Sequence, residues 1–317
     1  MKKYVFFLLI AAAVVGFIFF KVVNWEDKAK ATTTVEPALE TNGCLGLNYH
    51  RVRKHNWFNR VVSSVTKSDE LTEYSVYSND FEHQLKKLKE LDATFVTPKD
   101  IEAYQQKGTF PKRCVWISFD DIDRTVYQNA FPILKKENIP FTLYVIAGQV
   151  GATDFQNLNM ASWSQLKEMK DSGLATIGSH TYDMHRLEED KPLFLTPAKY
   201  SAFAEDLRKS KETIKNHLGI DPVYFAYPYG NTNDDVAKIV KDAGFHQAAI
   251  LAPHLITKDN DPYYLNRIVV YNKTFQNLSK PYSSLADTYK LVRRKCKKPL
   301  SKAEAFFCSP SKGMSIK

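Results

Sequence analysis

The segment CVWISFDD, Cys114 to Asp121, is the most informative part of the sequence for the fold class, because a short apolar run stops abruptly at two adjacent carboxylates. The run from Val115 to Phe119 is rich in bulky residues and bounded by polar ones, which is typical of a buried strand. In α/β barrels built from such strands, catalytic residues follow the carboxyl ends of the strands. The stretch therefore predicts a core strand with Asp120 and Asp121 at a functional edge of a sheet.

Six further runs of the same kind predict a sheet of about seven parallel strands. They occupy residues 45–49, 142–146, 174–178, 223–226, 247–251 and 267–270. Amphipathic stretches separate them. Ser162 and Gln165 form a capping box, while Asp80 and Thr196 stand where helix N-caps are expected. This alternation predicts an α/β fold, a distorted and incomplete (β/α) barrel.

Composition and charge exclude two classes of protein. With 44% hydrophobic residues and few Gly and Pro, the chain is neither disordered nor collagen-like. The net charge is +9, but residues 290–317 hold nine Lys and Arg against Glu304 alone, and residues 31–289 carry a slight negative charge. We therefore expect no nucleic-acid partner. The basic tail, residues 279–317, either meets an acidic surface such as anionic lipid or is simply solvated.

The amino-terminal segment carries a membrane-targeting signal. Tyr4 to Phe20 contains no charge, and lysines flank it on both sides. The run is longer than the roughly 7–15 residues of a signal-peptide core, which favours a signal anchor over residues 1–23. A linker is expected over 24–42, where Ala29-Lys30-Ala31 offers an alternative cleavage site. The body is therefore expected outside the cytoplasm, anchored by residues 4–23 or secreted after cleavage.

An apolar segment, NWFNRVVSSVT at residues 56–66, interrupts the pattern after the first strand. Trp57 and Phe58 make it a candidate loop for contact with a membrane or a polymer, or a segment folded onto the barrel.

Four cysteines lack metal-type spacing, so a structural role is expected for them. Cys44 and Cys114 lie six residues before His50 and Asp120, and would be neighbours if their strands lie side by side. The other pair, Cys296 and Cys308, lies within the basic tail and could crosslink it by a disulfide.

Residues suited to metal binding and proton transfer follow several predicted strands. They are His50, Asp120, Asp121, His180 and His185. Two imidazoles and one carboxylate form a three-ligand site that leaves positions open for water and substrate. Asp121, His180 and His185 are the predicted ligands, and Asp120 is left free to accept a proton.

Other interpretations of these residues remain open at this level. An adjacent Asp pair is often a helix cap or a solvated turn, and a single buried His is often a core residue. A glycosidase would need two carboxylates facing each other across a sugar, which adjacent aspartates do not provide. A non-catalytic polysaccharide-binding module would use aromatic side chains such as Tyr182, Tyr227, Tyr229 and Trp163 to contact sugar rings.

Four motifs resemble those of the polysaccharide deacetylases, carbohydrate esterase family 4 with its NodB-homology domain. They are SFDD at 118–121, HTYDMH at 180–185, AYPYG at 226–230 and LNYHRV at 47–52. The last is similar to the amino-terminal motif of the branch that acts on poly-β-1,6-N-acetylglucosamine of biofilm exopolysaccharide. The resemblance covers about residues 43–278, and implies that these form the catalytic domain.

The resemblance implies roles for individual residues. Asp120 matches the catalytic base, His50 the general acid of this branch, and the backbone N–H of Tyr229 a donor to the oxyanion. The ligand set matches the one assigned above, with zinc as the usual ion and cobalt, nickel or ferrous iron as alternatives. Tyr182, Tyr227 and Trp163 are candidates for sugar contact.

The sequence departs from the usual family pattern at three points. The second predicted ligand histidine follows the first by five positions instead of four, as in the exopolysaccharide branch. Ala226 stands where the third motif usually has Arg, so the group that orients Asp120 must come from elsewhere. Arg267 is a candidate for it, with a packing or salt-bridge role as the alternative. His254 resembles the late histidine of other family members and rivals His50 as the acid.

The expected function is metal-dependent N-deacetylation of an extracellular acetylated glucosamine polymer, releasing acetate and free amines. Peptidoglycan or chitin-like oligomers are the alternative substrates.

Overall fold

The computed structural model describes residues 41–54 and 74–270. The predicted signal anchor, residues 24–40 of the linker, the Trp57–Phe58 segment and the basic tail lie outside the described residues, as do Cys296 and Cys308. Within the described ranges, no helix combines the length and apolar character needed to cross a bilayer.

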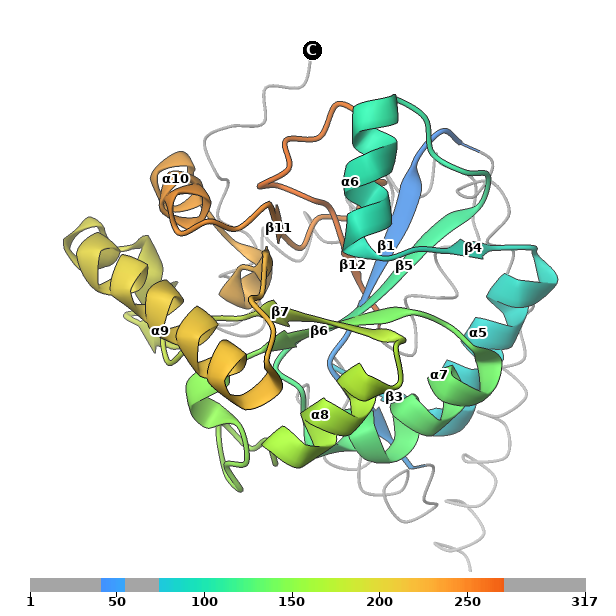
Figure 1. Cartoon of the computed structure of the whole chain (residues 1–317), viewed down its shortest axis with the longest axis horizontal. Helices are drawn as coiled ribbons and strands as arrows, with labels where there is room; N and C mark the ends of the chain where they lie inside the picture. Colours follow the sequence, from blue (N-terminus) through green and yellow to red (C-terminus); the bar gives the residue numbers. More distant parts are fainter. Residues whose placement is uncertain (1–40, 55–73, 271–317) are drawn as a thin grey trace, which may run out of the picture.

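All seven predicted strands are present, and together they form one parallel sheet. Its order is β11-β10-β7-β6-β5-β1-β12 (Figure 1). The strands are β1 (Cys44–Tyr49), β5 (Cys114–Phe119), β6 (Phe141–Val145), β7 (Ala175–Ser179), β10 (Tyr224–Ala226), β11 (Gln247–Ala249) and β12 (Ile268–Val269). A short strand that the sequence did not predict, β4 (Thr94–Phe95), pairs with the start of β5.

The two ends of this sheet approach each other through irregular hydrogen bonds. The N–H of Ile250 donates to the carbonyl of Leu265 at 2.9 Å, and that of Ala252 donates to the carbonyl of Arg267 at 2.9 Å. A single parallel bridge joins Ala249 to Leu265. No regular ladder links β11 to β12 in the described sheet, which agrees with the prediction of a distorted, incomplete barrel.

In the described part of the chain, six helices lie around the outside of the sheet, with α5, α7 and α8 along one side and α9 and α10 next to them (Figure 1). They are α5 (Ser78–Glu90), α6 (Pro98–Lys107), α7 (Phe131–Glu137), α8 (Trp163–Asp171), α9 (Tyr200–Leu218) and α10 (Asp234–Asp242). Two strand pairs lie apart from the main sheet: β2 (Arg51–Arg53) with β3 (Ser75–Tyr77), and β8 (Leu187–Glu188) with β9 (Lys191–Pro192).

The helix starts confirm one predicted cap and correct two. Ser162 caps α8 in a reciprocal capping box with Gln165, as predicted. Helix α5 begins at Ser78, so Asp80 lies in its first turn, where its charge favours the helix dipole. A 3-10 turn, Pro197–Lys199, separates Thr196 from α9, and the Thr196 side chain caps neither.

A disulfide between Cys44 and Cys114 joins the first residues of β1 and β5. The two cysteines are partners in the ladder, and the same register pairs Tyr49 with Phe119 at the far end. The expectation that these cysteines are neighbours is confirmed. Because both strands have six residues, the residues that follow them, His50 and Asp120, emerge at the same edge of the sheet.

Candidate active site

The carboxyl ends of the parallel strands bring the predicted polar residues together. His50 follows β1, Asp120 and Asp121 follow β5, and His180 follows β7. The N–H of Asp120 donates to the carbonyl of Tyr49 at 3.1 Å, which extends the β1–β5 ladder to the edge of the sheet. These residues are buried or half-buried, so the site is an enclosed one.

Asp121, His180 and His185 converge on one point. The Asp121 Oδ1 atom lies 3.5 Å from Nε2 of His180 and 3.2 Å from Nε2 of His185. The nearest ligand atoms of all three residues lie within 4.8 Å of one another. The donor set and this spacing fit a three-ligand site for a divalent ion.

Hydrogen bonding and burial prepare His180 for metal binding. Its Nδ1 lies 2.7 Å from the carbonyl oxygen of Ala226. Because a carbonyl only accepts, Nδ1 carries the proton, and the lone pair of Nε2 faces Asp121. Burial, opposed by the nearby carboxylates, lowers the pKa of His180 to about 4. The imidazole is therefore neutral near neutral pH, as a metal ligand must be.

Backbone strain marks the turns that carry the site. Asp121, Thr181 and Tyr229 have φ values of 64°, 77° and 61°, in the left-handed region that non-glycine residues rarely adopt. Each belongs to a different motif loop. Such strain costs on the order of 1–3 kcal/mol per residue and persists only where surrounding contacts hold it, which is common at active sites.

Asp120 forms a buried ion pair with Arg267. The guanidinium donates to the two carboxylate oxygens at 2.7 and 2.9 Å, and also to the hydroxyl of Ser118 at 3.2 Å. Burial by itself would raise the pKa of Asp120, but Arg267, with His180 and His50 nearby, outweighs burial and brings that pKa to about 2. Asp120 is therefore ionised and fixed in orientation.

The slot for Arg267 is built by aromatic rings and a glycine inside the sheet. The guanidinium carbon lies 5.1 Å from the ring centre of Tyr144 and 5.9 Å from that of Trp116. A Cβ on Gly46 of β1 would lie 2.6 Å from the carbonyl of Asn266 and 3.3 Å from the Arg267 side chain. Glycine in β1 thus leaves room for Arg267 to reach Asp120 from a strand on the other side of β1.

His50 faces the two carboxylates, whereas His254 lies elsewhere. Burial lowers the pKa of His50, and the charges of Asp121 and Asp120 oppose that shift. The ring packs edge-on against Tyr74 with centres 5.0 Å apart. His254 is exposed, on a segment that runs back to Cys44 at the opposite end of β1. Of the two candidate acids, the structure brings His50 to Asp120 and Asp121.

Tyr229 lies beside the ligand cluster. Its ring centre is 4.6 Å from that of His185, and it occupies a tight turn, Pro228–Gly230, directly after β10. Gly230 fixes that turn, because its φ of 66° and the contact of 2.3 Å that a Cβ would make with Leu251 exclude other residues.

The predicted sugar-contacting role of Tyr227 is wrong. Its side chain has no exposed surface and packs against Phe225 with ring centres 5.2 Å apart. The residue belongs to the core beneath α9 and α10, so it cannot touch a polymer. Trp163 stacks on His217 at 4.2 Å, and the Tyr182 ring lies under the ammonium of Lys209 at 3.9 Å. The rings of Trp163 and Tyr182 thus each contact another side chain of the protein, and their role in sugar contact stays a prediction.

A loop that the sequence did not single out adjoins His185. The Nε2 of Gln156 donates to the carbonyl of His185 at 2.9 Å, and the ring of Phe155 lies 6.3 Å from the His185 ring. The carboxylate of Asp123 accepts the N–H of Asn159 at 3.1 Å, which ties this loop to the first motif. The loop has no apolar periodicity, so no sequence signal indicated its position.

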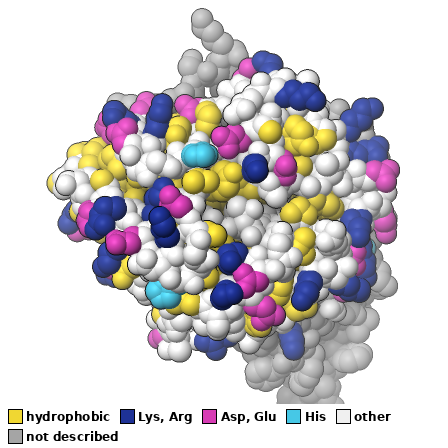
Figure 2. All heavy atoms as spheres, viewed as in Figure 1, with side chains coloured by type: hydrophobic (Ala, Val, Ile, Leu, Met, Phe, Trp, Pro, Cys, Tyr) yellow, Lys and Arg dark blue, Asp and Glu magenta, His cyan; other side chains and the backbone are white. Residues whose placement is uncertain are grey.

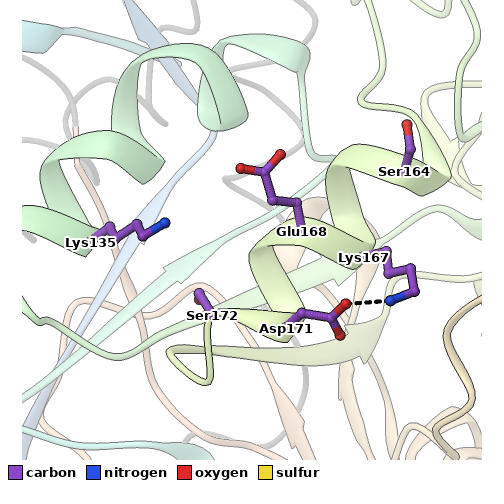
Figure 3. Close-up of a pocket in the computed structure, with 6 residues that line it drawn as sticks. All are labelled: Lys135, Ser164, Lys167, Glu168, Asp171 and Ser172. Carbon is purple, nitrogen blue, oxygen red and sulfur yellow. Dashed lines mark hydrogen bonds and ion pairs between the residues drawn. The ribbon is translucent and has the colours of Figure 1, made fainter.

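Among the residues that the structure describes, Asp121, His180 and His185 form the only group of His, Cys, Asp or Glu that could hold a metal ion. Figure 2 shows cationic and anionic side chains interspersed over the face in view. A hollow of about 460 Å³ lies between α7 and α8 and is lined by Lys135, Ser164, Lys167, Glu168, Asp171 and Ser172 (Figure 3). An ion pair joins Lys167 to Asp171 there. None of the predicted site residues lines this hollow.

An α/β barrel with such a cluster at its strand ends is the arrangement of an enzyme active site, and comparison with known proteins assigns the family. The polysaccharide deacetylase family model matches residues 107–248, and the chain belongs to that family. It is accordingly a hydrolase of the acetamide bond. The matched range contains Asp120, Asp121 and both ligand histidines, whereas His50 and Arg267 lie outside it.

Within the family, the chain is similar to enzymes of staphylococci. It is 42% identical over 239 residues to the poly-β-1,6-N-acetyl-D-glucosamine N-deacetylase of Staphylococcus aureus, covering 75% of this chain and 82% of that protein. It is 41% identical over 243 residues to the protein of the same name from Staphylococcus epidermidis, covering 77% and 84%. Among solved structures, IcaB from Ammonifex degensii matches with 34% identity and a TM-score of 0.65, covering 75% of this chain and 97% of that one.

Proposed function

We propose that this chain removes N-acetyl groups from poly-β-1,6-N-acetyl-D-glucosamine in a metal-dependent reaction outside the cytoplasm. The observation that carries the proposal is the identity of 42% to a relative of that named activity, over 82% of the relative's length. The convergence of Asp121, His180 and His185 supports the metal dependence.

The three predicted ligands suit a divalent ion. The buried Oδ1 of Asp121 has no hydrogen-bond partner, and Nε2 of His180 presents its lone pair to the same space. Zinc is the first expectation, and cobalt, nickel or ferrous iron accept the same donors. When bound, such an ion supplies a water of lowered pKa and polarises the acetamide carbonyl.

The protein's own groups then perform the proton transfers. Asp120, held by Arg267, accepts a proton from the attacking water. The backbone N–H of Tyr229 donates to the carbonyl oxygen as it becomes negative. The protonated form of His50 gives its proton to the departing nitrogen as the C–N bond breaks, so that acetate and a free amine result. The proton that Asp120 has taken from the water is then released, and His50 takes up a proton, which restores both groups.

The proposed location outside the cytoplasm is based on the composition of the two terminal segments. The apolar run of residues 4–23 would anchor the enzyme in the membrane, or be removed on secretion. Trp57, Phe58 and the basic tail would then contact the membrane or another anionic cell surface.

A comparison of substrates tests the proposal. The purified chain is incubated with acetylated β-1,6-glucosamine oligomers, chitin oligomers and peptidoglycan fragments, and acetate, free amines and chain length are measured. We expect acetate and amines in equal amounts, fastest from the β-1,6 oligomers, with no chain shortening. Faster release from chitin or peptidoglycan would replace the proposed substrate. No acetate from any of them, with divalent metal supplied, would favour a binding module.

A further inference from the structure

Helix α9 packs against the loop that joins the two predicted ligand histidines, His180 and His185. Two polar residues on one face of this helix, Asp206 and Ser210, point toward residues 181–184. They lie one turn apart and are buried, with side chains exposed by 8% and 0%. Buried polar groups on a helix of this kind need partners, and both find them in this loop.

The Asp206 carboxylate accepts hydrogen bonds from successive backbone N–H groups of the loop. Its Oδ1 accepts the N–H of Tyr182 at 2.8 Å, and its Oδ2 accepts the N–H of Asp183 at 2.8 Å. Two consecutive amides aimed at one carboxylate form a concave arrangement that a neutral side chain cannot satisfy equally well.

Ser210 holds the preceding residue of the loop. Its hydroxyl donates to the carbonyl of Thr181 at 3.2 Å and lies 2.7 Å from the hydroxyl of Ser179, the last residue of β7. The N–H of Ala147 donates to the same Thr181 carbonyl at 3.0 Å. Since Thr181 has a φ of 77°, these bonds hold a backbone conformation that this residue type disfavours.

The held segment lies entirely between the two imidazoles. Residues 181–184 separate His180 from His185 and form neither helix nor strand, so no regular ladder sets the distance between the two rings. Side-chain contacts to this loop come from α9 and from Gln149, whose Nε2 donates to the carboxylate of Asp183 at 2.5 Å. Their position decides whether both Nε2 atoms reach Asp121.

We propose that Asp206, assisted by Ser210, is a positioning residue for the metal site, holding the four-residue loop so that His180 and His185 face the same point. Asp206 is not itself one of the three converging ligands. The inference rests on the metal dependence of the proposed function. It assigns to α9 a role that no motif of the sequence indicates.

The test measures metal affinity rather than turnover. Full-length wild type, Asp206→Asn, Ser210→Ala and Glu212→Gln are stripped of metal and titrated with Zn²⁺ against a chromogenic chelator. Their Co²⁺ complexes are compared by visible absorption. Glu212→Gln is the matched control, because Glu212 lies on α9 but is exposed and paired with Arg208.

We expect Asp206→Asn to weaken Zn²⁺ binding by about 10- to 100-fold and to alter the Co²⁺ spectrum, as loss of an outer-shell partner does. Ser210→Ala is expected to weaken binding less, and Glu212→Gln to match wild type. Wild-type affinity and spectrum in Asp206→Asn would overturn the inference. If that variant does not fold, Ser210→Ala decides: weaker binding supports the inference and wild-type binding overturns it.

The same titration separates this inference from the proposed function. A wild-type protein that binds no divalent ion would overturn both. A wild-type protein that binds Zn²⁺ through Asp121, with Asp206→Asn binding equally well, would overturn the positioning role alone.

Discussion

The guanidinium of Arg267 donates two hydrogen bonds to the carboxylate of Asp120, although the residues lie 147 positions apart in the chain. Arg267 precedes β12, and Asp120 follows β5, with β1 between these two strands. The pair is almost fully buried, so the ionised state of the Asp120 carboxylate depends on the guanidinium of Arg267. This relationship fixes both the orientation and the ionisation of the proposed base.

Replacement of Arg267 by Lys should therefore impair catalysis more than substrate binding. A lysine ammonium cannot form the two parallel hydrogen bonds, so Asp120 loses its fixed orientation and its pKa rises. We expect kcat to fall by about 10- to 100-fold, as for other misplaced acid–base groups, with KM little changed. Steady-state kinetics across pH check this, and a wild-type kcat would contradict it.

The low pKa of Asp120 should appear in the acid stability of the metal-free protein. The pKa is about 2 in the folded protein against 3.8 for an unperturbed Asp, so ionised Asp120 stabilises the fold above about pH 4. That contribution, on the order of 2 kcal/mol, is lost as pH falls toward 2. Urea unfolding of wild type and Asp120→Asn should show their stability difference shrinking over this range. A difference that is constant with pH would contradict the assignment.

Asp120 and Asp121 should respond differently to the same substitution. Asp121→Asn removes a proposed ligand and should abolish metal binding together with acetate release. Asp120→Asn should keep the metal but lose about 100- to 10,000-fold in turnover, the usual contribution of a general base. Metal content by elemental analysis and acetate release are measured on both variants. Activity in metal-free protein, or in Asp121→Asn, would reject the ligand assignment.

The same substitution at His50 and at His254 tests which of the two histidines is the general acid. His50→Gln should lower kcat by about 100-fold or more, because the departing nitrogen loses its proton donor. His254 is exposed and lies away from the carboxylates, so His254→Gln should leave kcat near the wild-type value. Deacetylation kinetics of both variants decide between them. The reverse pattern would assign the acid to His254.

The Cys44–Cys114 disulfide should contribute to stability without affecting chemistry. It joins the amino ends of β1 and β5, whereas the site lies at their carboxyl ends. The double variant Cys44→Ser/Cys114→Ser should lose about 2–5 kcal/mol of unfolding free energy, since the crosslink closes a long loop. Below its melting temperature it should retain kcat. A large loss of kcat at full folding would show that the strand ends move without the crosslink.

The strand pattern and the polar residues at strand ends could be read from the sequence. All seven predicted strands occur in one sheet, because a short apolar run between polar boundaries is a local signal for a buried strand. Asp121, His180 and His185 could be grouped in advance, because the carboxyl ends of parallel strands share one edge. The proximity of Cys44 and Cys114 could be predicted in the same way, because both lie six residues before a strand-end residue of this edge.

The partners of these residues could not be predicted, because they come from distant parts of the chain that meet only in the folded protein. Arg267 reaches Asp120 across β1 because Gly46 leaves space for it, and Tyr227 is buried because α9 and α10 cover its side of the sheet. Asp206 meets the His180–His185 loop through the packing of a helix whose own sequence pattern shows only amphipathicity. Local sequence patterns reflect the hydrogen-bond and burial preferences of neighbouring residues. Contacts between residues that lie 20 to 150 positions apart form only when the sheet and its surrounding helices have assembled.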